Sequence, residues 1–410
     1  MRQVYPLLFL LISFLCGASL ASAADNLSTA YKPAAEKPEL KSKEEKTREA
    51  VERELLKFSG YYKNIYTASK TISTKEDYFA DIQRLRLSLE TKFTDALSAL
   101  LSYDNEIIIN DFSKNSDFGI IREKDQKKLA FWDADKTISD QKHTYWKHSL
   151  YRGYLKYAAP ALQYTLGKQA IDWSRMKLYQ PFDLFNPASP LDLEQDEKIG
   201  VDALNLEFYP EAFSSVNFIF APQKKFEKQG LGIKLAKKIK DYDVSLIMAE
   251  LNKDEIAGIG FDGYLKEAGL RGELTFTHKD NEKEFFRAAV GLDHNFSPKI
   301  YAITEYFYNG GAEKDSAQFL NSYQFSRQAL TMKKHILGTG IEYELSGVLK
   351  LTNYVFYDFA GKSVFLNPEI RYNIFTNLDF ILGAQDYWGD KNSEFGNYEN
   401  VYYAQAKWFF

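Results

Sequence analysis

Cysteine is nearly absent from this sequence, and its absence excludes several kinds of chemistry. The only cysteine, Cys16, lies in an apolar segment that starts with Arg2 and ends at the small residues Ala21, Ser22 and Ala23. A positive start, an apolar run and a small-residue site are the pattern of an export signal, which we place at residues 1–23. Once it is removed, no disulfide, cysteine metal ligand or thiol nucleophile remains.

Net charge and long apolar runs are also scarce. The formal net charge is −4 over 410 residues, so the composition does not indicate a nucleic-acid partner. The five histidines are scattered without the spacing of metal ligands, and we expect no metal site and no cofactor. After the first segment, no stretch is apolar enough to form a membrane helix.

Aromatic residues, by contrast, are abundant. Phe, Trp and Tyr make up 16% of the chain, with 31 Phe and 28 Tyr, yet the mean hydropathy is −0.40. An exported chain of this composition has two main forms: a soluble periplasmic β-domain, or a β-barrel with lipid outside and water inside. Residues 24–54 are rich in Lys, Glu and Ala and predict a flexible or partly helical periplasmic segment before the β-domain of residues 55–410.

Apolar and polar residues alternate along most of that domain. In "RLRLSLE", Leu85, Leu87 and Leu89 share one face, and Arg84 and Arg86 share the other. The same period of two recurs in "GLGIKLAKK" (230–238), "FFRAAVGLD" (285–293), "GTGIEYEL" (338–345) and "PEIRYNI" (368–374). Alternation of this kind predicts strands that are apolar on one side and polar on the other.

The lengths of the connections distinguish the two β forms. We predict about 18 strands, with about 16 as the alternative count, each long enough to cross a bilayer when tilted. Every second connection is a tight turn, and the other set includes every long one: residues 110–144, 176–199, 310–333 and 389–399. This sorting predicts an all-β, transmembrane, antiparallel up-and-down barrel with short periplasmic turns and long extracellular loops, rather than a sandwich.

The stretch "VYYAQAKWFF", from Val401 to Phe410, explains how such a barrel closes. Its alternation predicts a last strand that pairs with the first and leaves no open sheet edge in the membrane. Trp408 and Phe410 are expected in the periplasmic aromatic girdle. A strand of this form resembles the recognition signal of bacterial outer-membrane barrels, which implies the barrel-assembly machinery, lipid and lipopolysaccharide as partners and the Gram-negative outer membrane as the location.

Polar residues of these strands are candidates for a pore wall. Either their charges pair across strands in a hydrated wall, or opposed rows of cations and anions filter solutes. A barrel of this size can hold an aqueous channel. The strand residues that we assign to the pore wall are Arg84, Arg86, Glu90, Arg152, Lys168, Gln169, Arg287, Glu342, Glu369 and Arg371.

The loop at residues 176–199 has an unusual composition. It is rich in proline, aromatic residues and aspartate, and Phe182, Leu184 and Phe185 are too apolar for a loop in free water. We expect the loop to fold into the barrel and narrow it; the alternative is a lid packed on the rim. Its polar residues Asp183, Asn186, Asp192 and Glu194 are expected to face the solute.

A resemblance covers about 45 residues around this loop. "GKQAIDW", "PFDLFNP" and "GVDALNLEFYP" resemble a pattern of porin-like outer-membrane barrels, broadly akin to the alginate-export superfamily. Lys168 stands where that pattern has arginine, so a bidentate contact is absent. The resemblance implies a passive channel for small hydrophilic solutes. A surface adhesive barrel and a specific exporter or importer of a polysaccharide or organic solute are the alternatives, and no catalytic constellation is found.

Overall fold

The computed structural model describes residues 56–72, 74–110, 131–132, 134–187, 189–194, 198, 200–224, 229–279, 283–312 and 331–410. The predicted export signal (1–23) and periplasmic segment (24–54) lie outside the described residues, as do most of loop 110–144 and of loop 310–333. The strands all belong to one compact unit, Leu55–Phe410. Within the described residues, no helix is both long and apolar enough to cross a membrane.

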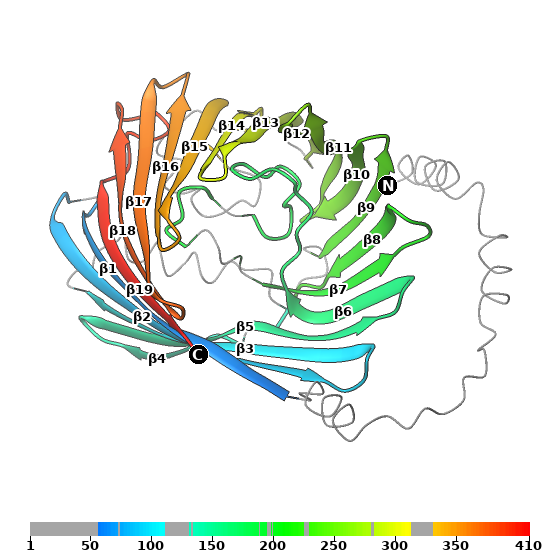
Figure 1. Ribbon diagram of the computed structural model, residues 1–410, viewed down its shortest axis with the longest axis horizontal. Coiled ribbons are helices and arrows are strands. Elements are labelled where there is room, and N and C mark those ends of the chain that lie inside the picture. The colour runs from blue at the N-terminus through cyan, green and yellow to red at the C-terminus, as the bar shows by residue number, and fades with distance from the viewer. Residues whose placement is uncertain are drawn as a thin grey trace, which may run out of the picture. The chain divides into compact units, whose positions relative to one another are not determined.

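The described chain forms one antiparallel β-sheet that closes on itself (Figure 1). Its strands are β1 (Leu56–Lys70), β2 (Asp77–Lys92), β3 (Leu97–Asn110), β4 (Lys136–Asp140), β5 (Thr144–Ala158), β6 (Leu162–Gln169), β7 (Val201–Phe208), β8 (Ser214–Ala221), β9 (Gly230–Ile239) and β10 (Tyr242–Leu251). They continue with β11 (Asp254–Leu265), β12 (Ala268–His278), β13 (Phe285–Ser297), β14 (Ile300–Asn309), β15 (His335–Ser346), β16 (Leu349–Asp358), β17 (Ser363–Phe375), β18 (Leu378–Trp388) and β19 (Val401–Phe409).

The barrel closes between its first and last strands. β1 pairs with β2 on one side and with β19 on the other, with Tyr61 opposite Phe409 and Ala68 opposite Tyr402. Of the 19 strands, β4 is an addition because β3 pairs directly with β5, which leaves 18 in the closed ring. The predicted fold class and strand count are confirmed, and closure leaves no unpaired edge between β1 and β19.

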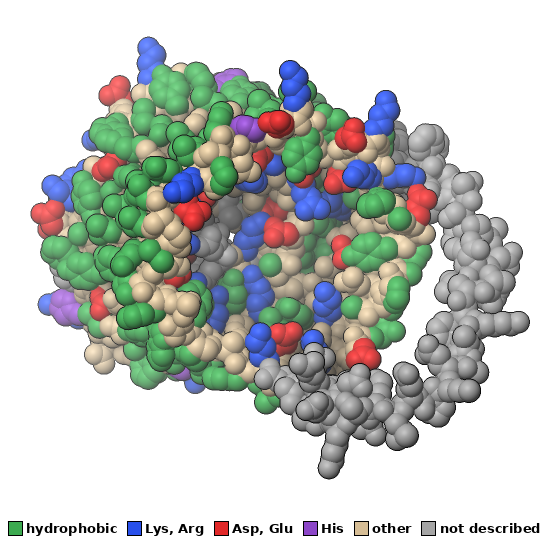
Figure 2. Space-filling view, viewed as in Figure 1, with side chains coloured by type: hydrophobic (Ala, Val, Ile, Leu, Met, Phe, Trp, Pro, Cys, Tyr) green, Lys and Arg blue, Asp and Glu red, His purple; other side chains and the backbone are tan. Residues whose placement is uncertain are grey.

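The two rims of the barrel differ, as the sequence predicts. One rim carries only short turns, at residues 93–96, 159–161, 209–213, 240–241, 266–267, 298–299, 347–348 and 376–377. The other rim carries the long connections, including residues 170–200, 310–334 and 389–400. Figure 2 shows a hollow in the middle of the molecule, with Lys, Arg, Asp and Glu side chains on its inner surface.

Strand β6 corrects the prediction. The sequence predicts a strand over 162–175, but β6 ends at Gln169 because the chain turns into the barrel there. β5 continues to Thr144, so its upper edge has no partner in β6. The short strand β4, which the sequence analysis does not predict, pairs with this edge, with Lys136 opposite His148. β4 therefore covers backbone groups that the departure of β6 leaves open.

Candidate functional site

The most distinctive feature of the lumen is the segment at residues 170–200, called here the inner loop. It leaves the wall just after Gly167, whose φ of +124° favours glycine and where a Cβ would lie 2.2 Å from the carbonyl oxygen of Gly153. The Gln169 side chain donates hydrogen bonds to the carbonyl oxygens of Ala203 (3.0 Å) and Thr165 (3.1 Å). Gly167 and Gln169 thus direct the chain inward, and Figure 1 shows the inner loop inside the ring of strands.

Apolar residues hold one end of the inner loop against the inner wall. Trp173, Phe182 and Phe185 are at most 3% exposed and belong to one cluster with wall residues. The other members are Ile171, Leu184, Val201, Ala203, Ile219, Ala221, Ile247, Leu251 and Ile256. Each fully buried large apolar side chain contributes about 1.5–3 kcal/mol to packing. The predicted inward fold of Phe182, Leu184 and Phe185 matches this packing.

Glycines in the wall provide the space for these rings. A Cβ on Gly232 would lie 2.5 Å from the Trp173 ring, and one on Gly258 would lie 2.8 Å from the Phe182 ring. Both positions face inward on strands β9 and β11. The wall therefore has a shallow recess that is complementary in shape to the aromatic residues of the inner loop.

A second apolar cluster anchors the middle of the inner loop. Tyr179 stacks on Phe307 of β14, with ring centroids 4.6 Å apart and an interplanar angle of 8°. It also meets Phe356 of β16 edge to face at 5.7 Å. Met176 is 2% exposed in the same cluster. The inner loop therefore contacts the wall over β14 to β16 as well as over β7 to β11.

Two inward carboxylates bind the backbone of the inner loop between these clusters. Glu273 of β12 accepts hydrogen bonds from the backbone N–H groups of Arg175 (2.7 Å) and Phe182 (3.0 Å). Glu305 of β14 accepts them from Lys177 (2.9 Å), Leu178 (2.9 Å) and Tyr179 (3.4 Å). Hydrogen bonds to ionised groups are stronger than those between neutral groups. Sequence reasoning places Glu273 on a polar face and gives Glu305 no role, because neither contact is local in sequence.

The interior of the inner loop is itself polar. Asp183 is 3% exposed and accepts hydrogen bonds from the backbone N–H groups of Trp173 and Ser174, at 3.2 and 3.1 Å. Its other oxygen forms an ion pair with Lys198. Burial raises the pKa of the Asp183 carboxyl, although the charge and hydrogen bond of Lys198 oppose the rise. Asn186 is 5% exposed and accepts from the N–H of Ile171 at 2.8 Å.

The prediction that these two side chains face the solute is therefore wrong, because both are buried in hydrogen bonds to the loop's own backbone. The Gln169 side chain, which is only 4% exposed, is likewise buried and does not line the pore as predicted. Lys168, 5% exposed, lies 3.9 Å from Asp135, a residue of the segment before β4. All four residues hold the inner loop or its surroundings in place.

The far end of the inner loop reaches the opposite side of the lumen. The Gln385 side chain of β18 donates to the carbonyl oxygen of Leu191 at 3.0 Å. Glu194 forms ion pairs with Lys63 of β1 and, at 2.7 Å, with Arg84 of β2. Asp192 accepts a longer hydrogen bond of 3.4 Å from the N–H of Ser189. The inner loop thus crosses the barrel from β6 to β1 and β2.

Glu194 joins a dense charge network on that side. Arg84 also binds Glu106 of β3, and Arg86 binds Asp104 through two hydrogen bonds of 2.5 and 2.6 Å. The Arg86 guanidinium lies 3.2 Å from the centre of the Tyr151 ring, and Lys147 lies 3.1 Å from Glu106. Arg84 and Arg86 therefore face inward as predicted, each paired with acidic residues.

The remaining predicted wall residues are spread around the lumen. Glu342 pairs with Lys350, and Glu369 pairs with Arg371 at 3.3 Å and accepts from Tyr403 at 3.3 Å. Arg152 donates to the carbonyl oxygen of Lys198 in the inner loop. Glu90 is exposed near the short-turn rim. Their contribution to a pore remains a prediction.

Arg287 of β13 differs from these wall residues because its side chain is buried, with 2% exposed. Its guanidinium lies 5.0 Å from the centre of the Phe285 ring, and its Nε and Nη2 atoms have no hydrogen-bond partner among the described residues. Arg287 is therefore not in contact with open solvent, contrary to the predicted pore-lining position.

The sequence places Lys234 on a polar strand face but gives no role to Arg175 and Lys177, two basic residues of the inner loop. Lys234 of β9 donates to the carbonyl oxygen of Trp173 at 2.5 Å, and with Arg175 it lines a hollow of about 460 Å³ towards the short-turn rim. Lys177 extends to Asp293 (3.2 Å) and to the Tyr301 hydroxyl (2.6 Å). Lys234 lies on the polar side of an alternating strand, which was the available signal. Arg175 and Lys177 lie in a segment without a period.

The part of the chain that the structure describes contains no cluster of candidate metal ligands. No group of three or more His, Asp or Glu side chains there has a geometry suited to a metal ion.

Comparison with solved structures gives the fold class independently. OccAB3 of Acinetobacter baumannii matches with a TM-score of 0.53 and 10% identity, over 87% of this chain and 99% of that one. OccK5 (OpdH) of Pseudomonas aeruginosa matches with a TM-score of 0.55 and 11% identity, over 87% and 98%. The outer membrane protein OpdK of the same organism gives 0.54 and 9%, over 87% and 98%.

The fold is that of porin-like outer-membrane barrels. OpdK has also been solved with vanillate. No protein-family model matches this chain, and no curated protein sequence matches it. At identities of 9–11% the likeness concerns the fold alone. In this porin-like barrel, the inner loop and the charged inner wall are the features that bear on function.

Proposed function

We propose that this chain is a channel of the Gram-negative outer membrane through which small hydrophilic solutes diffuse passively. The observation that carries the proposal is the inner loop, which crosses a charged lumen and is bound to the wall at both ends. A surface adhesin needs no such element inside its barrel. Passage through a wet lumen requires polar groups along the path, and paired charges such as Glu369 and Arg371 supply them.

The inner loop is the proposed constriction. It is bound to β12 and β14 through Glu273 and Glu305 and to β1 and β2 through Glu194, so it lies across the path of any solute. Its basic residues Arg175 and Lys177 are exposed and are proposed to contact the solute. On the neighbouring wall, Glu342, the register partner of Tyr301, and Arg371 are the corresponding candidates.

The direct test is conductance of the purified barrel in a planar lipid bilayer. We expect stepwise ionic currents, and deletion of residues 181–192 is expected to enlarge the steps. Barrels that fold and insert but pass no current would contradict the channel and favour the adhesive alternative. Normal currents that the deletion leaves unchanged would support the proposed channel but show that the inner loop is not its constriction. Liposome-swelling assays with sugars, organic acids and vanillate then identify the solute class.

The remaining features of the proposal concern export and assembly. We propose that residues 1–23 direct export, that residues 24–54 form a periplasmic segment, and that β19 is the contact with the barrel-assembly machinery. Pairing of β19 with β1 as the final closure supports this last role. Lipid and lipopolysaccharide are the proposed surroundings, no enzymatic activity is proposed, and the link with alginate-export barrels rests on the sequence pattern around the inner loop.

A further inference from the structure

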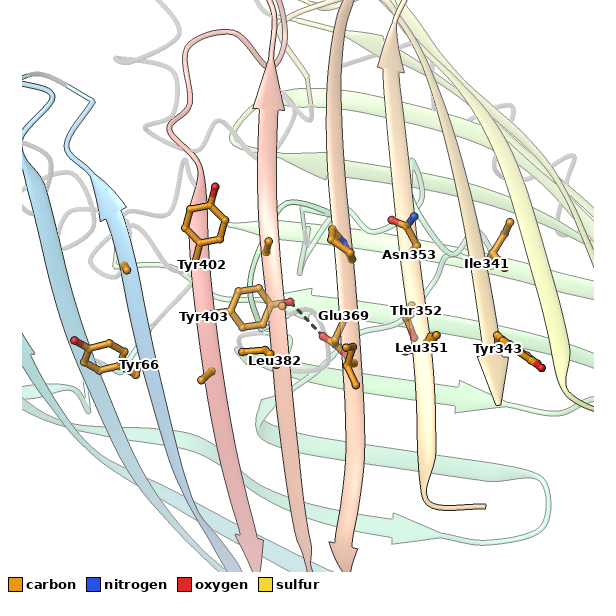
Figure 3. A pocket seen from close by; sticks show the side chains of 16 residues that line it. Tyr66, Ile341, Tyr343, Leu351, Thr352, Asn353, Glu369, Leu382, Tyr402 and Tyr403 are labelled. Carbon is orange, nitrogen blue, oxygen red and sulfur yellow. Dashed lines mark hydrogen bonds between the residues drawn. The ribbon is translucent and has the colours of Figure 1, made fainter. Parts of the chain in front are cut away.

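Charged side chains of the inner wall generally have a polar or charged partner. Figure 3 shows one case, in which the Tyr403 hydroxyl donates to Glu369 at 3.3 Å. Arg86 binds the Asp104 carboxylate through its Nε and Nη2 atoms, at 2.5 and 2.6 Å. Among the strands that the structure describes, Arg287 of β13 is the one arginine that forms neither an ion pair nor a hydrogen bond.

The surroundings of Arg287 are closed. Its side chain is 2% exposed, and its Nε and Nη2 atoms, the same edge that Arg86 turns to a carboxylate, have no acceptor. Its register partner on β12 is Thr275, which is 1% exposed and whose hydroxyl also lacks a hydrogen-bond partner. Two opposed side chains on adjacent strands therefore carry unsatisfied polar groups in the interior of the described structure.

The register partner on the other side, Asn309 of β14, supplies no acceptor. It is 0% exposed, and its side-chain amide donates to the carbonyl oxygen and the hydroxyl of Thr331 at 3.2 and 3.1 Å. Its side-chain oxygen accepts from the N–H of Gly311 at 3.1 Å. Both ends of the Asn309 side chain are thus used to hold the long-loop rim.

The carboxylates of the neighbouring wall do not neutralise Arg287 either. Glu273 of β12 and Glu305 of β14 accept hydrogen bonds from backbone N–H groups of the inner loop. The charge of Asp254 on β11 acts on Arg287, but no ion pair joins these two described residues. The described wall therefore places no counter-ion in contact with this guanidinium.

A guanidinium without a counter-ion is unfavourable at this position. It keeps its charge because an arginine side chain is not deprotonated in proteins. A buried charge is costly unless it is paired and hydrogen-bonded. The Phe285 ring, whose centre lies 5.0 Å from the guanidinium, attracts the cation but offers its N–H groups no acceptor in their plane. The component that this site requires is a negatively charged group from outside the chain.

We propose that Arg287 and Thr275 hold a small inorganic anion, chloride in the simplest case, in the wall between β12 and β13. The anion accepts hydrogen bonds from Nε and Nη2 of Arg287 and from the Thr275 hydroxyl. A monatomic anion suits the site because both side chains are closed off from solvent. The hollows of about 300 and 460 Å³ in the lumen are lined by other residues, so an organic solute there does not reach this edge.

The position of the site indicates what the anion does. Ala289, the next inward residue of β13, packs in the cluster of Tyr179 and Phe307 that anchors the inner loop. Asn309, beside Arg287, holds Thr331 at the long-loop rim. The anion completes the polar layer between the anchor and the rim, and it stabilises the barrel whether or not the barrel conducts.

Thermal unfolding of the detergent-extracted full chain tests the site, with sodium chloride exchanged for sodium gluconate at constant ionic strength. A ligand that binds only the folded state raises the unfolding temperature as its concentration rises. We expect this rise in the wild type and in Lys299→Gln, which removes an exposed rim cation, and its loss in Arg287→Met. In gluconate alone, Arg287→Met is expected to unfold at or above the wild-type temperature, because it removes an unpaired buried charge. No chloride dependence in the wild type, or an unchanged dependence in Arg287→Met, would overturn the proposal.

Thr275→Val is the second variant, and it serves where Arg287→Met does not fold. It keeps the shape of the side chain and removes only the hydroxyl, so we expect several-fold more chloride to be needed for half of the rise. A wild-type midpoint in Thr275→Val would reject the site between β12 and β13. Sodium acetate is the further arm, and stabilisation by acetate without stabilisation by chloride would rule out a monatomic anion.

Bromide locates the ion directly, because its anomalous scattering distinguishes it from water. In crystals of the wild-type chain grown in sodium bromide, we expect an anomalous peak within hydrogen-bond distance of Arg287 and Thr275. The same peak is expected to be absent from crystals of Arg287→Met. Bromide at other positions only would show that these two residues do not form an anion site.

Discussion

Glu273 and Glu305 point into the barrel from β12 and β14, and both end on the backbone of the same stretch of the inner loop. Glu273 accepts hydrogen bonds from the N–H groups of Arg175 and Phe182, and Glu305 accepts them from Lys177, Leu178 and Tyr179. Two side chains of the wall thus determine the path of a loop that is more than ninety residues away in sequence.

Replacing both carboxylates by alanine is expected to release the inner loop from β12 and β14. Each lost hydrogen bond to a charged group removes about 1.5–3 kcal/mol. We expect larger conductance steps and noisier currents in planar bilayers, with heat-modifiable migration retained. Glu284→Ala, which removes an exposed rim carboxylate whose partner is His278, is the control and should leave the steps unchanged. Identical currents in wild type and the double variant would show that the two glutamates do not hold the constriction.

Filling the recess under the aromatic residues should displace the inner loop by another route. Gly232→Val places atoms where the Trp173 ring lies, and overpacking of this kind costs about 1–3 kcal/mol. The expected result is increased protease cleavage within residues 170–200 and altered conductance. Gly347→Ala is the matched control, because no atom lies within 4 Å of a Cβ at that turn. Equal cleavage of the two variants would argue against close packing at Gly232.

Reversal of charge at Arg84 and Arg86 should change ion selectivity. Arg84→Glu with Arg86→Glu adds negative charge beside Asp104, Glu106 and Glu194, and breaking such buried pairs costs about 3–5 kcal/mol each. We expect the reversal potential in a salt gradient to shift towards cations and the unfolding temperature to fall. Lys240→Glu with Lys266→Glu, in exposed turns at the rim, controls for total charge. An unchanged reversal potential would place the network away from the narrow part.

A buried acid at the long-loop rim predicts that the stability of the segment at residues 389–400 depends on pH. Glu394 lies between β18 and β19, is 2% exposed, and accepts a hydrogen bond of 2.7 Å from the N–H of Lys333. Burial raises its pKa from 4.5 to about 8, and the nearby Asp358 carboxylate adds to the rise while Lys333 opposes it. Between these two pH values the folded segment holds a proton that the unfolded segment has lost, so its stability falls as pH rises.

We therefore expect cleavage within residues 389–400 to increase from pH 5 to pH 9 in the wild type. Glu394→Gln cannot ionise and is expected to flatten the increase. Glu399→Gln, which removes a surface partner of Lys75, is the control and should retain the wild-type profile. Taking the ratio of each variant to wild type at every pH removes the pH dependence of the protease. A Glu394→Gln profile parallel to that of the wild type would show that Glu394 does not cause the pH dependence of cleavage.

The arrangement of the barrel could be predicted from the sequence because it rests on local periodicity. Leu85, Leu87 and Leu89 alternate with Arg84 and Arg86, and a strand puts alternate side chains on opposite faces whatever its neighbours are. The sorting of short and long connections then favoured an up-and-down barrel. The sequence did not predict β4, because the unpaired edge of β5 that it covers exists only where β6 leaves the wall.

The site was less accessible to sequence reasoning. Composition was sufficient to place Phe182, Leu184 and Phe185 against a wall, since exposed apolar side chains are unfavourable in water. It was not sufficient to separate Asp183 and Asn186, which satisfy the loop's own N–H groups, from Arg175 and Lys177, which are exposed. Polar residues of a loop look alike in sequence, and only their partners distinguish a structural role from contact with solute.

By itself, then, the sequence determined which side chains face lipid and which face the lumen, and that one inward loop interrupts the wall, because period and composition are properties of single segments. The tertiary structure alone decided that Glu273, Glu305 and Glu194 bind that loop. Those contacts join strands far apart along the chain. Their register depends on the closure of the whole sheet, which no single segment records.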